Sequence, residues 1–237
     1  MAIGIHPDDV EIGCGGTVAL SVARGHDVVI VDLTRGESST NGTVEERARE
    51  AAAAAKVLGV AERVNAGLPD TGVRSDDTEQ IRALVRILRA HRPDVALLPH
   101  ADDPHHDHAA GALLARHAIF LANVNGYGTD GANGPQERWR VSRSLVYPGR
   151  RDVRADVVVD VTSVYETKVA AIRAHATQVG SSAGSLPTPL TDPRFLGVVD
   201  ARDRLAGRRI GVTHGEAFEM LAPLALGDLT VLVKAES

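Results

Sequence analysis

The chain has a single cysteine, Cys14, among its 237 residues, which excludes an internal disulfide and fits a reducing compartment. Aromatic residues make up only 3% of it, so its core must consist mainly of valine, leucine, isoleucine and alanine. There is no stripe of lysine and arginine, and the net charge is −5, which argues against nucleic-acid binding because neutralising phosphates requires a clustered basic face. We expect neither a leader sequence nor a membrane span, because no charged segment followed by an apolar one opens the sequence and no apolar run approaches membrane-spanning length. We therefore expect a soluble, cytoplasmic protein that binds neither nucleic acid nor membrane.

The first hundred residues alternate short apolar runs with helical patterns. Strands are expected at 2–5, 27–34, 63–68 and 94–100, and helices at 17–25, 43–59 and 77–91. The helix at 43–59 has the clearest boundaries, because Thr43 and Glu46 form a capping box and Gly59 follows the last turn. This order predicts an α/β fold: a Rossmann-like, doubly wound and mostly parallel sheet with helices on both faces.

The second half continues with expected helices at 108–120 and 163–178, strands at 144–148 and 156–162, and a basic helix near the C-terminus. Two long polar loops, 125–140 and 181–193, lie between these elements, and loops of this length often cover a site. We expect substrate specificity to reside in them. Because neither a repeat nor a linker divides the sequence, we expect residues 1–237 to form one domain.

A dense group of ionisable residues follows the first expected strand, in the stretch IHPDDVE at residues 5–11. The simplest explanation is a strand-to-helix turn, in which Pro7 fixes φ and an aspartate caps the next helix. Glu11 has no role in such a turn, and we expect it to contact a neighbouring functional side chain.

A dinucleotide site is a second interpretation of this region. Glycines at positions 13, 15 and 16 precede a helix, and Asp32 ends the second strand, where a ribose-binding acid would lie. The G-x-G-x-x-G fingerprint is incomplete, however, because the glycines do not follow the strand directly and Val18 stands in the third glycine position. The glycines are then expected to allow close packing of the helix, and Cys14 to pack as a small apolar residue.

A metal site is the third interpretation. Zinc binds imidazole nitrogen and carboxylate oxygen, and catalytic zinc sites have three protein ligands and one open position. His6 and Asp9, three positions apart across a proline turn, can converge on one ion, whereas Asp8 between them stays free to accept a proton. This interpretation requires a third ligand from elsewhere in the chain.

The segment DDPHHDH at 102–108 can provide that ligand, since it holds three histidines and three aspartates directly after the fourth expected strand. Asp107 is suited to cap the helix that follows. His105 and His108 share one face if the segment is helical, so that one can bind metal while the other faces a substrate. Parallel strands end at a common sheet edge, where ligands bind. The two clusters together therefore predict a metal-hydrolase site.

These residues carry a resemblance to a known family. The chain resembles the PIG-L / LmbE-like zinc-dependent N-acetylglucosamine deacetylases, whose motif A-H-P-D-D-x-E is read here at residues 5–11 and whose motif H-x-D-H is read at 105–108. Segment 32–59, AIRAHATQ at 171–178 and GEAF at 215–218 are similar to the deacetylases of bacillithiol biosynthesis. The resemblance implies the PIG-L / LmbE-like fold over nearly the whole chain.

The resemblance implies that His6, Asp9 and His108 bind one Zn²⁺ per subunit, and the mixed nitrogen and oxygen ligands are also compatible with Fe²⁺. It further implies a small-molecule N-acetylglucosaminide substrate, N-acetylglucosaminyl-malate in the bacillithiol subfamily. Many members of that subfamily are hexamers, so a homo-oligomer, specifically a homohexamer, is expected.

The resemblance also implies the catalytic roles. Asp8 would be the general base, His105, held by Asp107, would stabilise the oxyanion, and Arg47 would contact the substrate. The products would be acetate and a free amino sugar.

Several alternatives remain open. Pro104 stands where the bacillithiol enzymes have an arginine, so the group attached to the sugar is malate, a mycothiol-type inositol or part of a natural product. From other classes, a nucleotide-binding Rossmann protein and a non-catalytic metal-binding module remain. Asp8 and His105 argue against the module, because a structural zinc site is closed by four protein ligands.

Overall fold

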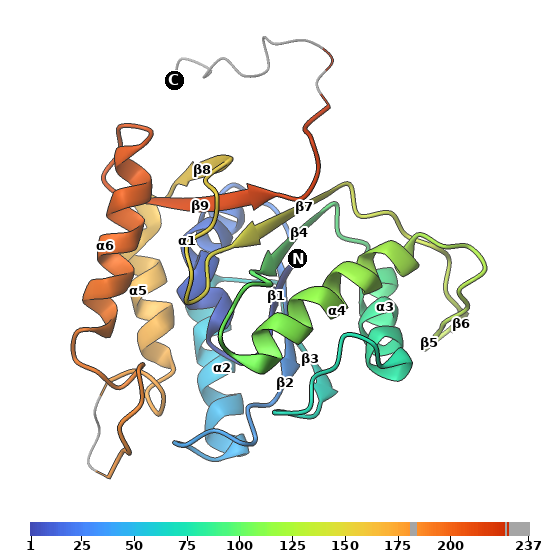
Figure 1. Ribbon diagram of the computed structural model, residues 1–237, viewed down its shortest axis with the longest axis horizontal. Helices are drawn as coiled ribbons and strands as arrows, with labels where there is room; N and C mark the ends of the chain where they lie inside the picture. Colours follow the sequence, from blue (N-terminus) through green and yellow to red (C-terminus); the bar gives the residue numbers. More distant parts are fainter. Residues whose placement is uncertain (181–183, 226, 228–237) are drawn as a thin grey trace.

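Figure 1 shows a computed structural model of the protein, which describes residues 1–180, 184–225 and 227. The main sheet has the strand order β3-β2-β1-β4-β7-β9-β8. In chain order its strands are β1 (Ala2–Gly4), β2 (Val29–Thr34), β3 (Glu62–Leu68), β4 (Val95–Pro99), β7 (Arg143–Tyr147), β8 (Val157–Asp160) and β9 (Gly215–Met220). Neighbouring strands from β3 to β7 are parallel, whereas β9 is antiparallel to both β7 and β8.

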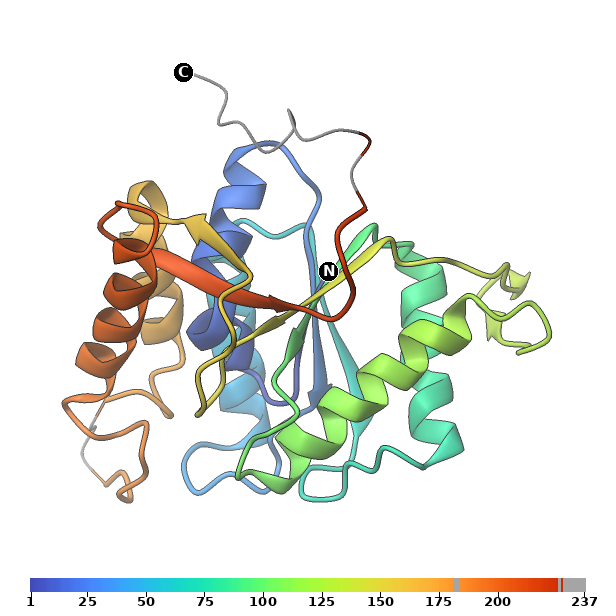
Figure 2. The same cartoon turned by 45° about the horizontal axis from the view of Figure 1, so that its top comes forward.

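Helices cover both faces of this sheet (Figures 1 and 2). One face carries α1 (Asp9–Ala23), α2 (Val44–Leu58) and α5 (Tyr165–Ala174), which follows the short helix η1 (Thr162–Val164). The other face carries α3 (Thr78–His91) and α4 (His106–Ala122), and α6 (Phe195–Arg208) packs against β9. The expected α/β fold, with a mostly parallel sheet between two layers of helices, is confirmed.

The central strands are apolar on both faces, as a sheet covered on both sides requires. In β1, the neighbouring residues Ala2 and Ile3 are both fully buried but belong to different apolar clusters. Ile3 lies with Leu84 of α3 and Leu114 of α4, whereas Ala2 lies with Val18 of α1. The core therefore consists of two aliphatic layers, one on each side of the sheet.

Local sequence signals determine the ends of α2. The Thr43 hydroxyl accepts a hydrogen bond from the Glu46 amide, and the Glu46 carboxylate accepts one from the Thr43 amide, which completes the capping box. Gly59 ends the helix in the left-handed region with φ 71°, a conformation that glycine adopts without strain. These predicted boundaries are confirmed.

Three predictions about elements were wrong. The helix expected at 17–25 begins at Asp9 instead and contains a break at Cys14 (φ −148°, ψ 24°). The helix cap expected from Asp107 is made by His105, whose Nδ1 accepts a hydrogen bond from the Asp107 amide at 3.2 Å. Loop 125–140 contains a short hairpin, β5 (Asp130–Gly131) and β6 (Gly134–Pro135).

Segment 211–221, for which the sequence analysis assigned no element, contains β9. Within the described part of the chain, no helix combines the length and the hydropathy that a membrane span requires.

Candidate active site

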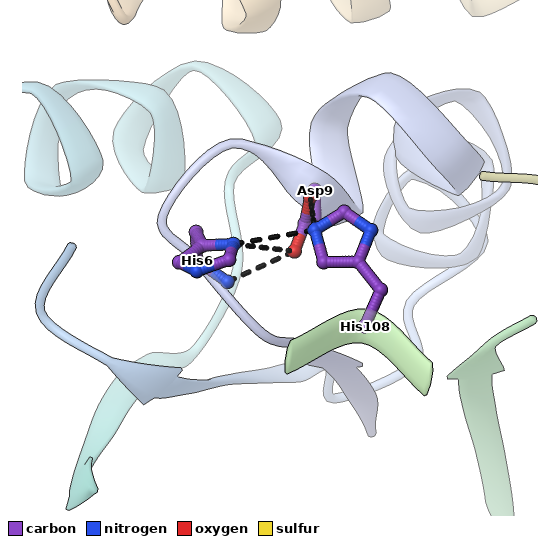
Figure 3. Close-up of side chains that lie close together, drawn as sticks. All are labelled: His6, Asp9 and His108. Atoms are coloured by element: carbon purple, nitrogen blue, oxygen red, sulfur yellow. Dashed lines mark hydrogen bonds and ion pairs between the residues drawn. The ribbon is translucent and has the colours of Figure 1, made fainter. Parts of the chain in front are cut away.

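The segment that follows β1 and the beginning of α4 bring together three side chains that could hold a metal ion (Figure 3). His6 Nδ1 lies 3.2 Å from His108 Nε2, His108 Nε2 lies 3.4 Å from Asp9 Oδ1, and His6 Nδ1 lies 3.7 Å from Asp9 Oδ2. Ligand bonds of about 2 Å around a tetrahedral ion place the ligand atoms about 3.3 Å apart. This donor triad, His6, Asp9 and His108, therefore matches a zinc-sized ion in spacing and in donor chemistry.

The backbone fixes Asp9 in this position. Asp9 Oδ2 accepts hydrogen bonds from the amides of Ile5 and His6, both at 2.9 Å, so the carboxylate closes the turn between β1 and α1. Burial alone would raise the pKa of Asp9, but the neighbouring His108 and His6 side chains hold it well below its usual range. Asp9 is therefore ionised at neutral pH, as a metal ligand must be.

A carboxylate lies behind each histidine of the triad. Asp70 Oδ1 is 3.0 Å from His6 Nε2, and Asp103 Oδ2 is 3.4 Å from His108 Nδ1. Such partners fix the tautomer and the orientation of ligating histidines. Asp70 is held in turn by the Ser38 amide, at 2.8 Å from Oδ2.

These carboxylates make the triad a site that favours positive charge. Burial alone would lower the pKa of His6, but Asp107, Asp70 and Asp9 raise it to about 12. A divalent cation would supply this positive charge in place of protons. Neither Asp70 nor Asp103 was predicted as a site residue, although Asp70 follows a parallel strand at the same sheet edge and Asp103 lies in the acidic cluster itself.

Asp8 lies beside the triad but points to a different partner. Its Oδ2 accepts a hydrogen bond from Arg47 Nη2 at 3.2 Å, and only 5% of the residue is exposed. Burial and the charge of Asp9 raise the pKa of Asp8, and Arg47 partly offsets them, so that the pKa is about 6. Its φ of 142° is strained for a residue with a side chain, a state that costs on the order of 1–3 kcal/mol and is common at functional sites.

Arg47 is itself buried, with 3% of its surface exposed. Its guanidinium donates to the carbonyl oxygen of Pro7 at 2.7 Å and to that of Gly36 at 3.4 Å, as well as to Asp8. Arg47 therefore joins the turn after β1 to the loop after β2. The hydrogen-bond partners of its guanidinium are thus Asp8 and the backbone of the loops around the site.

His105 stacks on His108, with 4.6 Å between ring centroids, and its ring centroid is 5.0 Å from that of His6. Because Nδ1 accepts the Asp107 amide hydrogen, the proton of the neutral ring lies on Nε2. Burial and the nearby charge of His108 lower the pKa of His105, which favours this neutral form.

The carboxylate of Asp107 has partners other than the His105 ring that was expected. Its Oδ2 accepts a hydrogen bond from the Thr71 amide at 2.6 Å and lies 3.8 Å from His6 Nε2. Asp107 therefore holds His105 through its backbone amide, and its carboxylate supports the side of His6 that faces away from the triad.

Glu11 belongs to a separate buried network. Its Oε1 lies 2.5 Å from Arg63 Nη1, and Arg63 also forms two bonds with Asp32, at 2.7 and 2.9 Å. His175 Nε2 is 3.4 Å from the same Glu11 oxygen. The partners of Glu11 are therefore Arg63 and His175, neither of which the sequence predicted as a site residue.

The dinucleotide interpretation does not fit this arrangement. Asp32 is 2% exposed and paired with Arg63, so it is not available to a ribose. A side chain at Gly13 would overlap the ring of Tyr147, and one at Gly16 would lie 2.9 Å from Cβ of Val161. The glycines therefore allow close packing, as the sequence analysis expected.

The two long loops lie in different places. Loop 125–140 follows α4, whose 17 residues extend about 25 Å, so it lies far from His108 at the helix start (Figure 1). This position is at odds with the expectation that substrate specificity resides in loop 125–140. Residues 181–183 of the second loop lie outside the described residues. Leu186 of that loop exchanges two hydrogen bonds with the side chain of Asn41, at 2.8 and 3.0 Å, which ties it to the loop after β2.

Comparison with known proteins shows the family and the fold. A protein-family model described as "PIG-L: GlcNAc-PI de-N-acetylase" matches residues 1–119. The crystal structure of the conserved protein TT1542 from Thermus thermophilus superimposes with a TM-score of 0.84, 35% identity and 95% coverage of both chains.

Three relatives with different names show the range of the similarity. A 1D-myo-inositol 2-acetamido-2-deoxy-alpha-D-glucopyranoside deacetylase of Mycobacterium sp. (strain KMS) is 30% identical, covering 79% of this chain and 76% of the relative. The 4-oxalmesaconate hydratase of Pseudomonas putida is 31% identical, covering 75% and 73%. The uncharacterized deacetylase YaiS of Escherichia coli is 35% identical over 46% of this chain, and the match spans 62% of YaiS.

Proposed function

Because this chain belongs to the PIG-L family of de-N-acetylases, we propose that it is a metal-dependent hydrolase acting on an N-acetylglucosamine conjugate. It removes the acetyl group and releases acetate and the free amino sugar. The observation that carries this proposal is the donor triad at metal-ligand spacing, with the buried carboxylate of Asp8 beside it.

His6, Asp9 and His108 would hold the ion, and Zn²⁺ is the first candidate, with Fe²⁺ as the alternative. Bound there, such an ion supplies Lewis-acid chemistry, by lowering the pKa of a water and polarising the acetamide carbonyl. Asp70 and Asp103 orient the two histidines from behind, at 3.0 and 3.4 Å.

Asp8 is the proposed general base. A carboxyl group with a pKa of about 6 is ionised at neutral pH and still basic enough to accept a proton from the attacking water. The same carboxyl then donates that proton to the departing amine. Arg47 holds Asp8 in place at 3.2 Å, and we propose that its effect on the substrate acts through Asp8.

His105 is the proposed donor to the developing oxyanion. Its Nδ1 is fixed by the Asp107 amide, so Nε2–H is the hydrogen that it can offer. A donor already held in position stabilises the transition state without reorganisation during the reaction. Asp107 supports this arrangement through its backbone and through His6.

The substrate class is tested with the metal-loaded enzyme on a panel of N-acetylglucosaminides, with release of free amine as the readout. N-acetylglucosaminyl-malate is the first candidate, and the similarity to the mycobacterial deacetylase makes an inositol glycoside the second. Asp8→Asn should retain the metal and lose most of the turnover, whereas His108→Ala should lose the metal. Asp76→Asn, at an exposed carboxylate on the loop before α3, is the matched control and should change neither.

A hydratase is the rival function, because the chain is 31% identical to the 4-oxalmesaconate hydratase. A hydratase adds water to a carbon–carbon double bond, so it would reduce the ultraviolet absorbance of an unsaturated tricarboxylate such as 4-oxalmesaconate and release no amine. Hydration without any amine release across the panel would replace the deacetylase proposal.

We also propose that the chain forms a homo-oligomer, a hexamer in the first instance. Large apolar side chains at the surface support this, among them Phe120, which is 70% exposed, and Val198, which is 65% exposed. Light scattering coupled to size-exclusion chromatography measures the assembly, and a monomer at micromolar concentration would contradict the proposal.

A further inference from the structure

Helix α1 is broken at Cys14, and side chains from distant elements bind the backbone on both sides of the break. In an unbroken helix the Gly16 amide would donate to the Ile12 carbonyl. Here the Gly16 amide donates to Glu216 Oε1 at 2.9 Å, and the Ile12 carbonyl accepts a hydrogen bond from Arg202 Nη2 at 2.5 Å. The two groups that would pair across the break are therefore bound separately, one by β9 and the other by α6.

These two side chains belong to one charged cluster. Glu216 also accepts a hydrogen bond from the Thr17 amide, at 2.6 Å from Oε2, and pairs with Lys168 of α5 at 2.6 Å. Lys168 pairs with Asp203 of α6 at 2.6 Å, and Asp203 pairs with Arg202 at 3.1 Å. We call these residues, Lys168, Arg202, Asp203 and Glu216, the α1 clamp.

Three members of the α1 clamp are buried, the side chain of the fourth, Arg202, is 17% exposed, and the formal charges of the four balance. Lys168, Glu216 and Asp203 are exposed by 0%, 1% and 2%. Charges at such depth cost several kcal/mol each unless they are paired and hydrogen-bonded. Two cations and two anions, linked in a chain that ends on the backbone of α1, meet that condition.

The glycines of α1 allow the clamp to reach the helix. A Cβ atom at Gly16 would lie 3.0 Å from Glu216 Oε1 and 2.9 Å from Cβ of Val161. A Cβ at Gly15 would only reach van der Waals contact with Cγ of Lys168, at 3.4 Å, so the close approach depends on Gly16. The same break separates α1 into a short segment that carries Asp9 and a longer segment that packs against the sheet.

We propose that the α1 clamp is a positioning device for the active site. By fixing the break at Cys14 it sets the orientation of the short segment, and with it the positions of Asp9 in the donor triad and of Asp8 beside it. Its members do not touch the donor triad and act through the backbone, so they are positioning residues. The proposal rests on the proposed function, because it takes Asp9 as a metal ligand.

If the clamp only stabilised the fold, its removal would lower the melting temperature and leave the metal site of the folded protein unchanged. Metal affinity and ligand geometry therefore separate the two possibilities. The variants are Glu216→Gln, which weakens the cap on Gly16 and Thr17, and Arg202→Met, which removes the bond to the Ile12 carbonyl. The double variant Lys168→Met/Glu216→Gln removes one charge of each sign and supplies the comparison if Glu216→Gln alone does not fold.

Arg89→Met is the matched control. Arg89 of α3 is also buried, at 3% exposure, and it donates to the carbonyl oxygens of Ala122 and Tyr127 and to the Thr129 hydroxyl. Arg89→Met should lower the melting temperature as the clamp variants do. The contacts that it removes lie at the end of α4 far from His108.

Zinc affinity is measured by competition with a chelator, and ligand geometry from the visible absorption of the Co²⁺-loaded chain. We expect the clamp variants to bind Zn²⁺ about tenfold more weakly and to shift the Co²⁺ bands, with Arg89→Met unchanged in both. Parental affinity and parental bands in folded clamp variants would overturn the clamp proposal alone. A parent chain that bound neither ion would overturn the proposed function and the clamp proposal together.

Discussion

Asp70 provides the sharpest test of how the metal site is organised. Its Oδ1 lies 3.0 Å from His6 Nε2, and its Oδ2 accepts the Ser38 amide at 2.8 Å. The carboxylate therefore holds the Nε2 proton of His6 and leaves Nδ1, which faces Asp9 and His108, to bind a metal. Asp70→Asn preserves the size of the side chain but offers only one acceptor oxygen, so either His6 or Ser38 loses its partner.

The expected magnitude follows from this loss. Removing a carboxylate behind a ligating histidine lowers metal affinity by about 10- to 100-fold, or roughly 1.4–2.8 kcal/mol. The loss of a negative charge acts in the same direction, because Asp70 is among the groups that raise the pKa of His6. A less basic His6 is a weaker ligand.

The assay is competition for Zn²⁺ between the protein and a chromophoric chelator at neutral pH. Asp76→Asn is the control, because Asp76 lies six residues away and pairs with Arg74 at the surface. A folded Asp70→Asn variant with the zinc affinity of the parent would refute the assignment of Asp70 as the partner of His6.

Three further predictions concern the buried charges and the glycines. Burial raises the pKa of Asp8 and Arg47 lowers it. Arg47→Met should therefore raise the pKa of Asp8 and move the acidic limb of the pH profile of kcat/KM to higher pH. An acidic limb at the parental pH would show that Arg47 does not set the pKa of the general base. Burial alone would raise the pKa of Glu11, but Arg63 and His175 lower it from 4.5 to about 2. This carboxylate therefore contributes roughly 3 kcal/mol above about pH 4.5, which is lost as the pH falls toward 2, and Glu11→Gln should flatten the loss of unfolding free energy in urea between about pH 5 and pH 3. Gly16→Ala places a methyl group 2.9 Å from Val161 and should cost about 1–3 kcal/mol, seen as a lower melting temperature, whereas Gly126→Ala, with open space around it, should not.

Topology was enough to predict from the sequence that the two ionisable clusters meet, whereas the choice of His108 over His105 as the third metal-binding residue came from the family resemblance. His6 and Asp9 come directly after β1, and His108 comes after β4, the strand beside β1. Once the order of apolar runs indicates a parallel sheet, strand ends meet at one edge. The same reasoning extends to Asp70 after β3, but a single carboxylate in a loop is too common a feature to single out.

The long-range partners could not be predicted. Glu216 binds the amide of Gly16 from 200 positions away, and Arg63 joins Glu11 to Asp32 across two strands and a helix. A charged residue in a strand or helix is ordinarily read as a solvated one. Only the packing of α5, α6 and β9 against α1 shows that these charges are buried and paired.

By itself the sequence determined the alternation of strands and helices, the capped ends of α2 and the histidines and aspartates that meet at the sheet edge. These depend on residues a few positions apart, or on the rule that parallel strands end together. The tertiary structure decided where α1 breaks, which oxygen of each carboxylate faces which histidine, and that the carboxylate of Asp107 supports His6. These depend on distances between residues far apart in the chain, which are set only when the two apolar layers pack against the sheet.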